Sequence, residues 1–227
     1  IIYFISWHFS GHFNCPLLIG DAFNDARLMA KVSNYLGDFA SLVDGDDHLK
    51  ETQQSSRLIH AGYYLKLYQD QVSLPNGDIV GREYLVHPGA VAILPLLDDG
   101  RILMERQYRY PLKQAILEIP AGKLDPEEST LVCAQRELQE ETGYTAKYWD
   151  FLGKIHPVIS HSTEFIDIYL ARGLSFGEAR LDDGEFLDVF AVEPRQVHDW
   201  IKSGLITDVK TIISWYWLME FLESNPG

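Results

Sequence analysis

The chain has 227 residues, 46% of them hydrophobic, which suffices for one domain with an ordinary core and an appendage. Its 33 acidic and 19 basic residues give a net charge of −14, which repels a nucleic-acid backbone and argues against nucleic acid as a partner. Cys15 and Cys133 form neither a disulfide framework nor a CxxC zinc motif, so we expect two buried thiols in a reducing cytoplasm.

Residues 1–50 form an N-terminal extension without strand alternation, and residues 30–43 have the spacing of a short helix. The apolar stretch 1–20 is interrupted by Pro16 and has no basic start, so we expect neither a membrane helix nor a signal peptide, and no membrane partner. The first methionine is Met29, and we hypothesise that the working protein begins near it and that earlier residues are dispensable. The opposing interpretation is that the aromatic residues of this extension form a hydrophobic plug.

From residue 51 the pattern predicts a single domain that extends to residue 227. Strands are expected at 63–68, 81–86, 90–97, 101–108 and 115–119, and 90–97 is apolar enough to be a central strand. Asn76-Gly77 and Asp98-Asp99-Gly100 are predicted to be turns.

After Gly122 the period becomes helical. We expect a helix over residues 126–142, with Leu131, Ala134 and Leu138 facing the core and Gly143 as its C-terminal cap. Strands follow at 149–155, 165–171 and 186–190, and helices at 194–202 and 208–222. The chain is therefore predicted to be an α/β or α+β sandwich around a mixed sheet.

The helix at 126–142 concentrates negative charge. Glu137, Glu140 and Glu141 share one face, where like charges destabilise an isolated helix. One interpretation is a solvated surface. The other is a site for a hard cation such as Mg²⁺, which prefers carboxylate oxygens and bridges to substrate phosphates.

The spacing around these glutamates favours the second interpretation. Gly122 is followed by five residues and Glu128, and then by seven residues and Arg136-Glu137-Leu138-Gln139-Glu140-Glu141-Thr142-Gly143-Tyr144. This stretch matches the Nudix box, Gly-x5-Glu-x7-Arg-Glu-bulky-x-Glu-Glu-x-Gly-bulky, at every specified position. The chain therefore resembles the Nudix hydrolases.

The resemblance implies an α/β/α sandwich of the Nudix type with additional N-terminal antiparallel strands. It implies that Glu137 and Glu141 bind Mg²⁺, or Mn²⁺ in its place, that Glu140 is shared between metal binding and catalysis, and that the carbonyl of Ala121 is a further ligand. Glu128 and Arg136 would orient the catalytic helix, and a structural salt bridge between them is the alternative.

Outside the box the chain is similar to the ADP-ribose pyrophosphatase branch, through segments such as His87-Pro88-Gly89-Ala90-Val91 and Glu118-Ile119-Pro120-Ala121-Gly122. The branch places a glutamate in a loop after the box, and the match here is Glu164, our candidate base. An ordinary strand-edge carboxylate is the alternative. The loop departs from the branch at Ser160-His161, where glycine is usual.

The same resemblance suggests four residues for substrate binding. Arg82 and Glu83 would reach the nucleoside. Arg106 and Arg109 lie on one expected strand; we expect them to face the same side and to meet the diphosphate or a dimer partner. A solvated edge or a salt bridge is the alternative for the two arginines.

The implied reaction is Mg²⁺-dependent hydrolysis of ADP-ribose, a nucleotide sugar, to AMP and ribose 5-phosphate. The implied protein is a cytoplasmic homodimer with the strands of residues 51–88 at its interface. Alternatives are a Nudix hydrolase of another nucleotide sugar such as GDP-mannose, or of a nucleoside triphosphate, and a non-catalytic Nudix-fold binding module. Such a module is expected to have lost box carboxylates, which this chain keeps.

Overall fold

The structure, a computed structural model, describes residues 46–178, 181, 184 and 186–225. The expected helix at 30–43, the proposed start at Met29 and the environment of Cys15 lie outside these residues. The chain separates into two compact units. Of the described residues, the first unit contains 46–52, with the short 3-10 helix η1 (Asp46–His48), and the turn 73–79; the second contains the rest.

A three-stranded sheet is formed by β1 (Thr52–Ala61), β2 (Lys66–Ser73) and β3 (Ile79–Val86), in that order. The predicted start of the strand expected at 63–68 is wrong, because β2 begins at Lys66. Residues 63–65 belong to the turn after β1, where the Gly62 N–H donates to the Leu65 carbonyl. β1 was not predicted, since all ten of its residues are exposed and its sequence lacks alternation. The turn at Asn76-Gly77 is confirmed, and Gly77 adopts φ +89°.

The second sheet has seven strands, in the order β10-β5-β4-β9-β8, with β6 paired to β5 and β7 to β4. β4 and β9 run parallel, whereas the pairs β10–β5, β4–β5, β4–β7, β5–β6 and β8–β9 run antiparallel, so the sheet is mixed, as predicted. β4 is central, also as predicted. The strands are β4 (Ala90–Leu96), β5 (Ile102–Arg109), β6 (Gln114–Glu118), β7 (Ala121–Lys123), β8 (Tyr144–Ile155), β9 (Ile166–Phe176) and β10 (Leu187–Val192), with the 3-10 helix η2 (Tyr110–Leu112) between β5 and β6.

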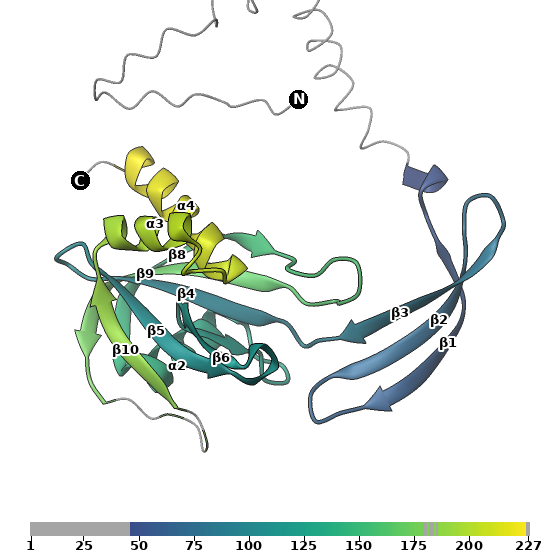
Figure 1. The fold of residues 1–227 in the computed structure, drawn as a ribbon, viewed down its shortest axis with the longest axis horizontal. Helices are drawn as coiled ribbons and strands as arrows, with labels where there is room; N and C mark the ends of the chain where they lie inside the picture. The colour runs from purple at the N-terminus through teal and green to yellow at the C-terminus, as the bar shows by residue number, and fades with distance from the viewer. Residues whose placement is uncertain (1–45, 179–180, 182–183, 185, 226–227) are drawn as a thin grey trace, which may run out of the picture. The chain divides into compact units, whose positions relative to one another are not determined.

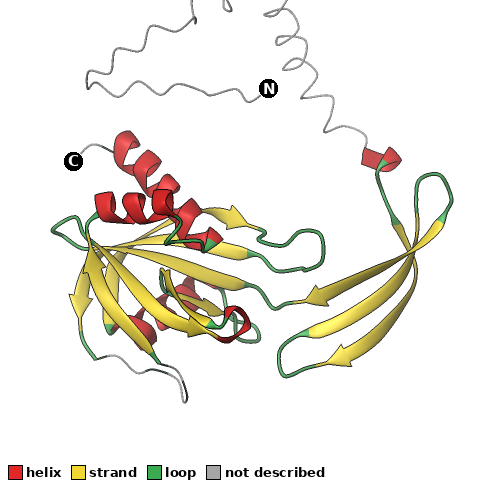
Figure 2. Ribbon diagram, in the orientation of Figure 1, coloured by secondary structure: helices red, strands yellow, loops and turns green. Residues whose placement is uncertain are grey.

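Helices cover both faces of this sheet (Figures 1 and 2). Along β4, Val91 and Ile93 pack with buried residues of α2 (Thr130–Thr142), whereas Ala92 and Leu94 pack on the side of α3 (Pro194–Ser203) and α4 (Val209–Ser224). This alternation is the two-residue period of a strand buried on both faces. The predicted α/β/α sandwich is therefore confirmed.

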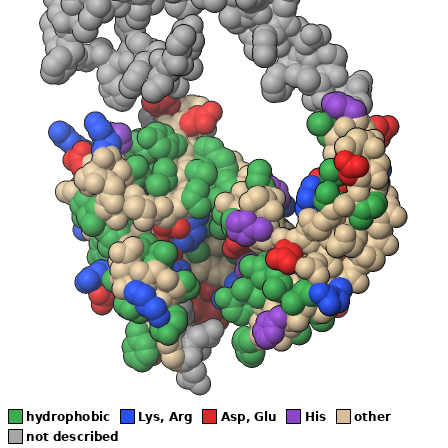
Figure 3. All heavy atoms as spheres, turned by 45° about the vertical axis from the view of Figure 1, so that its right-hand side comes forward, with side chains coloured by type: hydrophobic (Ala, Val, Ile, Leu, Met, Phe, Trp, Pro, Cys, Tyr) green, Lys and Arg blue, Asp and Glu red, His purple; other side chains and the backbone are tan. Residues whose placement is uncertain are grey.

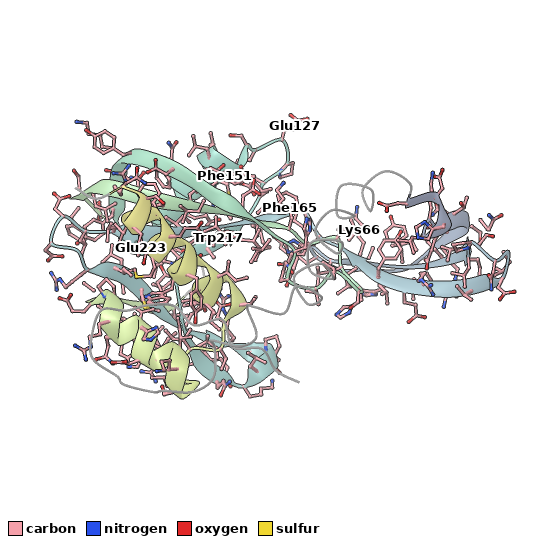
Figure 4. All side chains as sticks on the ribbon, turned by 90° about the horizontal axis from the view of Figure 1, so that it is seen from above. Lys66, Glu127, Phe151, Phe165, Trp217 and Glu223 are labelled. Carbon is pink, nitrogen blue, oxygen red and sulfur yellow. The ribbon has the colours of Figure 1, made fainter. Side chains whose placement is uncertain are left out.

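Close packing of α4 on the sheet depends on Gly153 of β8. A Cβ at this position would lie 2.7 Å from the ring of Trp217, a residue of α4 that is labelled in Figure 4. Among the described residues, no helix combines the length and apolar character needed to span a membrane.

The box helix α2 begins later than predicted. Ser129 caps it by accepting a hydrogen bond from the Val132 N–H, so residues 126–129 are loop, and Glu128 lies before the helix rather than in it. The expected core residue Leu131 is 38% exposed, and Cys133 is buried instead, as was expected of this thiol. Ala134 and Leu138 are buried and Gly143 is the C-cap with φ +75°, which confirms those predictions.

Candidate active site

The box begins where β7 runs antiparallel to β4, with Ala121 opposite Ala92 and Gly122 opposite Val91. Gly122 is needed here for space. A Cβ on Gly122 would lie 1.8 Å from the carboxyl carbon of Glu137, so the glutamate occupies the volume that any other residue would fill. Gly122 therefore fixes where the Glu137 carboxylate rests against the loop.

Glu141 approaches the same loop from the next turn of α2. Its side chain accepts a hydrogen bond from the Ala121 N–H at 3.0 Å, and the residue is only 4% exposed. The solvated-surface interpretation is therefore wrong for this glutamate. Since Glu137 and Glu141 are four residues apart on one helix face, both carboxylates meet the Ala121–Gly122 segment.

Arg136 is bonded to three carboxylates. Its Nε and Nη2 donate to the two oxygens of Glu128 at 3.0 and 2.9 Å, and its Nη1 donates to Glu137 at 2.8 Å and Glu140 at 2.9 Å. Arg136 Nη2 also donates to the Lys123 carbonyl. One cation therefore organises both the loop and the helix of the box.

The Glu128 carboxylate closes the loop before the helix as well, because it accepts from the Asp125 N–H at 3.1 Å. Hydrogen bonding from Arg136 lowers the pKa of Glu128 to about 2. The structure thus contains the salt bridge between Glu128 and Arg136 that was one of the two interpretations of this pair, and the salt bridge connects the loop before α2 to the helix.

The box carboxylates suit a cation whose remaining ligands come from elsewhere. Within the described part of the chain, no three His, Cys, Asp or Glu side chains form a ready cation site. Mg²⁺ is commonly held by one or two carboxylates together with waters and substrate phosphates. Glu137 and Glu141, which meet at one loop, fit that requirement.

A second charged network lies at the entry to the box. A salt bridge was one alternative for Arg109, but Glu118 and Lys210 were not predicted as its partners. Arg109 donates twice to Glu118, at 2.7 Å each, and Lys210 of α4 donates to Glu118 at 2.5 Å and lies 3.0 Å from Asp208. Arg109 also interacts electrostatically with Glu141. The Thr211 hydroxyl accepts from the Ile119 N–H, so α4 is tied to the segment that leads into the box.

The expectation that Arg106 and Arg109 face the same side is wrong. Residues three apart on a strand face opposite sides. Glu118 of β6 pairs with Glu105 of β5, and Arg109 bonds to this Glu118. Arg106 instead lines a surface hollow together with Tyr108 and Asp188. Arg109 is therefore the arginine of this pair that the structure connects to the box.

The loop of Glu164 is fixed to the end of β3. The Leu85 N–H donates to the His161 carbonyl, and the Thr163 N–H donates to the Leu85 carbonyl. Glu164 is about one-quarter exposed, and its Oε1 lies 3.9 Å from Nε2 of His87. Ala90 pairs with both Ile166 of β9 and Lys123 of β7, so β4 holds this loop beside the box.

Arg82 and Glu83 lie on the exposed part of β3. Glu83 accepts a hydrogen bond from Gln69 of β2, and an Arg82 guanidinium nitrogen donates to the Gly81 carbonyl. Both residues therefore belong to the three-stranded sheet, and the contacts of their side chains described above are made within that sheet. His87, Lys123, Glu118 and Lys210 were not predicted as site residues, although His87 and Glu118 were part of the segments that suggested the branch.

Comparisons with known proteins agree with this geometry. Residues 86–212 match the NUDIX domain family. The chain is 42% identical over 158 residues to the methanol dehydrogenase activator of Bacillus methanolicus, covering 69% of this chain and 85% of that protein. It is 38% identical over 181 residues to the ADP-ribose pyrophosphatase of Bacillus subtilis, covering 78% of this chain and 98% of that protein.

The fold has a counterpart among solved structures. A crystal structure of an ADP compounds hydrolase superposes with a TM-score of 0.71 at 23% identity, covering 78% of this chain and 96% of that one. At this identity the likeness concerns the fold alone. The box spacing, the sandwich and the family match agree, and the chain belongs to the Nudix family.

Proposed function

We propose that this protein catalyses the Mg²⁺-dependent hydrolysis of the diphosphate bond of ADP-ribose, giving AMP and ribose 5-phosphate. The observation that carries the proposal is the convergence of Glu137 and Glu141 on Ala121–Gly122 at the start of β7. The choice of ADP-ribose is supported by the similarity to the Bacillus subtilis protein that bears this activity in its name.

Glu137, Glu141 and the Ala121 carbonyl would hold the metal, Mg²⁺ or Mn²⁺ in its place, with Glu140 shared between metal binding and catalysis. When bound, the metal supplies neutralisation of the diphosphate oxygens and a lower pKa for a coordinated water. Arg136 holds Glu137 and Glu140 on the same side of α2. Glu128 anchors Arg136 and so fixes the direction of the helix relative to its loop.

Glu164 is the proposed base. It would take the proton of the attacking water as the water oxygen bonds to one phosphorus, and the bond from that phosphorus to the bridging oxygen breaks. The bridging oxygen leaves with the other phosphate, which completes AMP and ribose 5-phosphate. Its position in a loop held by β3 and β4, one-quarter exposed, leaves the carboxylate reachable by a water.

Positive charge for the diphosphate is proposed to come from Arg109. Its guanidinium is held by Glu118 and keeps 41% exposure. Arg106, on the other side of β5, is proposed to bind substrate less directly or to meet a partner subunit. Arg82 and Glu83 are proposed contacts to the nucleoside.

We further propose a cytoplasmic homodimer with β1–β3 at its interface. Every residue of β1 is exposed, including Leu58 and Ile59, and hydrophobic side chains lie among charged ones on the surface of this sheet (Figure 3). An exposed apolar surface on a sheet is a common interface. Light scattering at micromolar concentration tests this, and a monomer alone would contradict it.

The activity is tested with a panel containing ADP-ribose, GDP-mannose, other nucleotide sugars and nucleoside triphosphates, assayed by phosphate release after phosphatase coupling. We expect the highest kcat/KM for ADP-ribose, loss of activity in chelator and its return with Mg²⁺. Full activity in chelator would refute the metal mechanism. A tenfold preference for GDP-mannose or a triphosphate would refute the substrate assignment while leaving Nudix chemistry in place.

A further inference from the structure

His87 lies in the short segment between β3 and β4, and its side chain faces the candidate base Glu164. Its side chain is 9% exposed, and its Nε2 faces the Glu164 carboxylate at 3.9 Å. The ring of Tyr64 meets it edge-on, with centroids 6.2 Å apart. The imidazole is therefore confined on one side by an aromatic ring and on another by the carboxylate.

The hydrogen bonds of the ring determine which nitrogen carries its proton. The Gly89 N–H donates to His87 Nδ1 at 3.1 Å, so Nδ1 is the acceptor and the proton of the neutral ring is on Nε2. Burial lowers the pKa of His87, while Glu164 raises it and Lys123 lowers it further. The neutral ring thus presents an N–H toward Glu164.

The backbone around His87 is built together with the Glu164 loop. The His87 N–H donates to the Thr163 hydroxyl, and the Ala90 N–H donates to the Phe165 carbonyl. Gly89 adopts φ +100°, and a Cβ on it would lie 2.4 Å from the Phe165 ring, which is labelled in Figure 4. Thr163 and Phe165, which flank Glu164, are therefore held in place by the segment around His87.

We propose that His87 is a positioning residue, whose Nε2–H directs the Glu164 carboxylate toward the attacking water. This rests on the proposed role of Glu164 as base. The 3.9 Å separation is about 1 Å longer than a hydrogen bond, and catalytic hydrogen bonds often shorten only in the substrate complex. A neutral donor orients a carboxylate without the full loss of basicity that a neighbouring cation would cause.

Two substitutions separate the two nitrogens. His87→Asn retains an acceptor near Nδ1 for Gly89 and removes the donor toward Glu164, whereas His87→Gln places an amide donor near Nε2. With ADP-ribose and Mg²⁺, we expect His87→Asn to lower kcat about 10-fold with little change in KM, and His87→Gln to retain kcat within about 3-fold. Asp99→Asn, in the exposed turn between β4 and β5, is the control and should leave kcat unchanged.

The dependence on Glu164 is tested by a double-mutant cycle. If His87 acts through Glu164, His87→Asn should have no further effect in the Glu164→Gln background. Independent, multiplying effects would overturn the inference, as would full kcat in His87→Asn or rescue by Asn and not by Gln. If Glu164→Gln itself keeps full kcat, both the base assignment and this inference fail, while metal-dependent hydrolysis stands.

A second readout does not need activity. In protein labelled with ¹⁵N-histidine, with the His87 signals assigned from His87→Gln, NMR should show Nε2 protonated and Nδ1 unprotonated. Glu164→Gln should shift the Nε2 resonance. A proton on Nδ1, or an Nε2 signal unaffected by Glu164→Gln, would overturn the inference even if no substrate in the panel were hydrolysed.

Discussion

Two clusters of charged residues near the start of the box differ in their charge balance. In the box cluster, Arg136 alone faces Glu128, Glu137 and Glu140, and Glu141 lies on the same helix. In the entry cluster, which consists of Arg109, Glu118, Asp208 and Lys210, two cations face two carboxylates.

The difference in balance suggests a difference in role. The entry cluster is neutral by itself, and Glu118 is 2% exposed with both cations bonded to it, so the charge of Glu118 is balanced within the protein. The box cluster keeps an excess of negative charge beside a loop, where a divalent cation would offset it. We therefore interpret the buried Glu118–Lys210 pair of the entry cluster as scaffold and the box cluster as the site, with Arg109 at the partly exposed edge of the entry cluster. Substitutions in the scaffold pair and in the box cluster should affect different quantities.

The largest effect is expected from the scaffold. Glu118→Gln removes the buried charge that pairs Lys210, a side chain that is 10% exposed, and should lower the free energy of unfolding by about 3 to 5 kcal/mol. Urea unfolding measures this. Adding Lys210→Met should restore part of the loss, because it removes the excess positive charge that Asp208 alone does not balance. Asp99→Asn, in the exposed pair with Arg101, is the control and should leave the midpoint unchanged. An unchanged midpoint in Glu118→Gln would contradict the scaffold interpretation.

The site should respond in the opposite way. Glu141→Gln keeps an oxygen that can accept from the Ala121 N–H but removes charge, so turnover should fall at least about 100-fold with little loss of stability. Steady-state kinetics and urea unfolding of the same preparation check both halves. A stable variant with full turnover would remove Glu141 from the metal site.

The sequence predicted the box region well because its information is local. Helical spacing identified the shared face of Glu137, Glu140 and Glu141 and the cap at Gly143, and the match to the Nudix box implied the Glu128–Arg136 pair. The central strand β4 was equally evident, since burial on both faces leaves a continuous apolar run.

What the sequence did not predict depends on distant contacts or on special local geometry. Glu118 and Lys210 are 92 positions apart, and only the packing of α4 brings them together. The strand β1 has no alternating pattern because none of it is buried. The start of α2 was placed too early because Pro126 and Glu127 resemble a first turn, whereas Glu127 adopts φ +65° and Ser129 provides the cap.

A smaller effect is expected from substituting Gly122, because the substitution changes the position of the Glu137 carboxylate and leaves its charge unchanged. Gly122→Ala would displace the flexible Glu137 carboxyl rather than the backbone, so the fold should persist. We expect kcat/KM to fall about 10-fold and the Mg²⁺ concentration for half-maximal activity to rise. Gly81→Ala, where the nearest atom to a new Cβ is 3.8 Å away, is the matched control. Equal effects of the two substitutions would show that Gly122 has no special role.

The smallest effect concerns the pH dependence of stability at Glu128. The Arg136 hydrogen bonds lower the pKa of this carboxyl from 4.5 to about 2. A carboxyl with a lowered pKa in the folded state contributes stability that is fully present above its unfolded pKa and is lost as the pH falls through the folded one. The contribution of Glu128 should therefore be intact above about pH 4.5 and decrease between pH 4.5 and 2.

Urea unfolding over that pH range, in the wild type and in Glu128→Gln, tests the assignment. The variant should be less stable at neutral pH, and the difference between the two proteins should narrow as the pH is lowered, because acid neutralises the same group that the substitution removes. Glu127→Gln, one residue earlier on the exposed loop (Figure 4), should follow the wild-type curve. A constant difference between wild type and Glu128→Gln down to pH 2 would mean that Glu128 contributes through its shape and not its charge. The box cluster would then lack the electrostatic link between loop and helix that distinguishes it from the entry cluster.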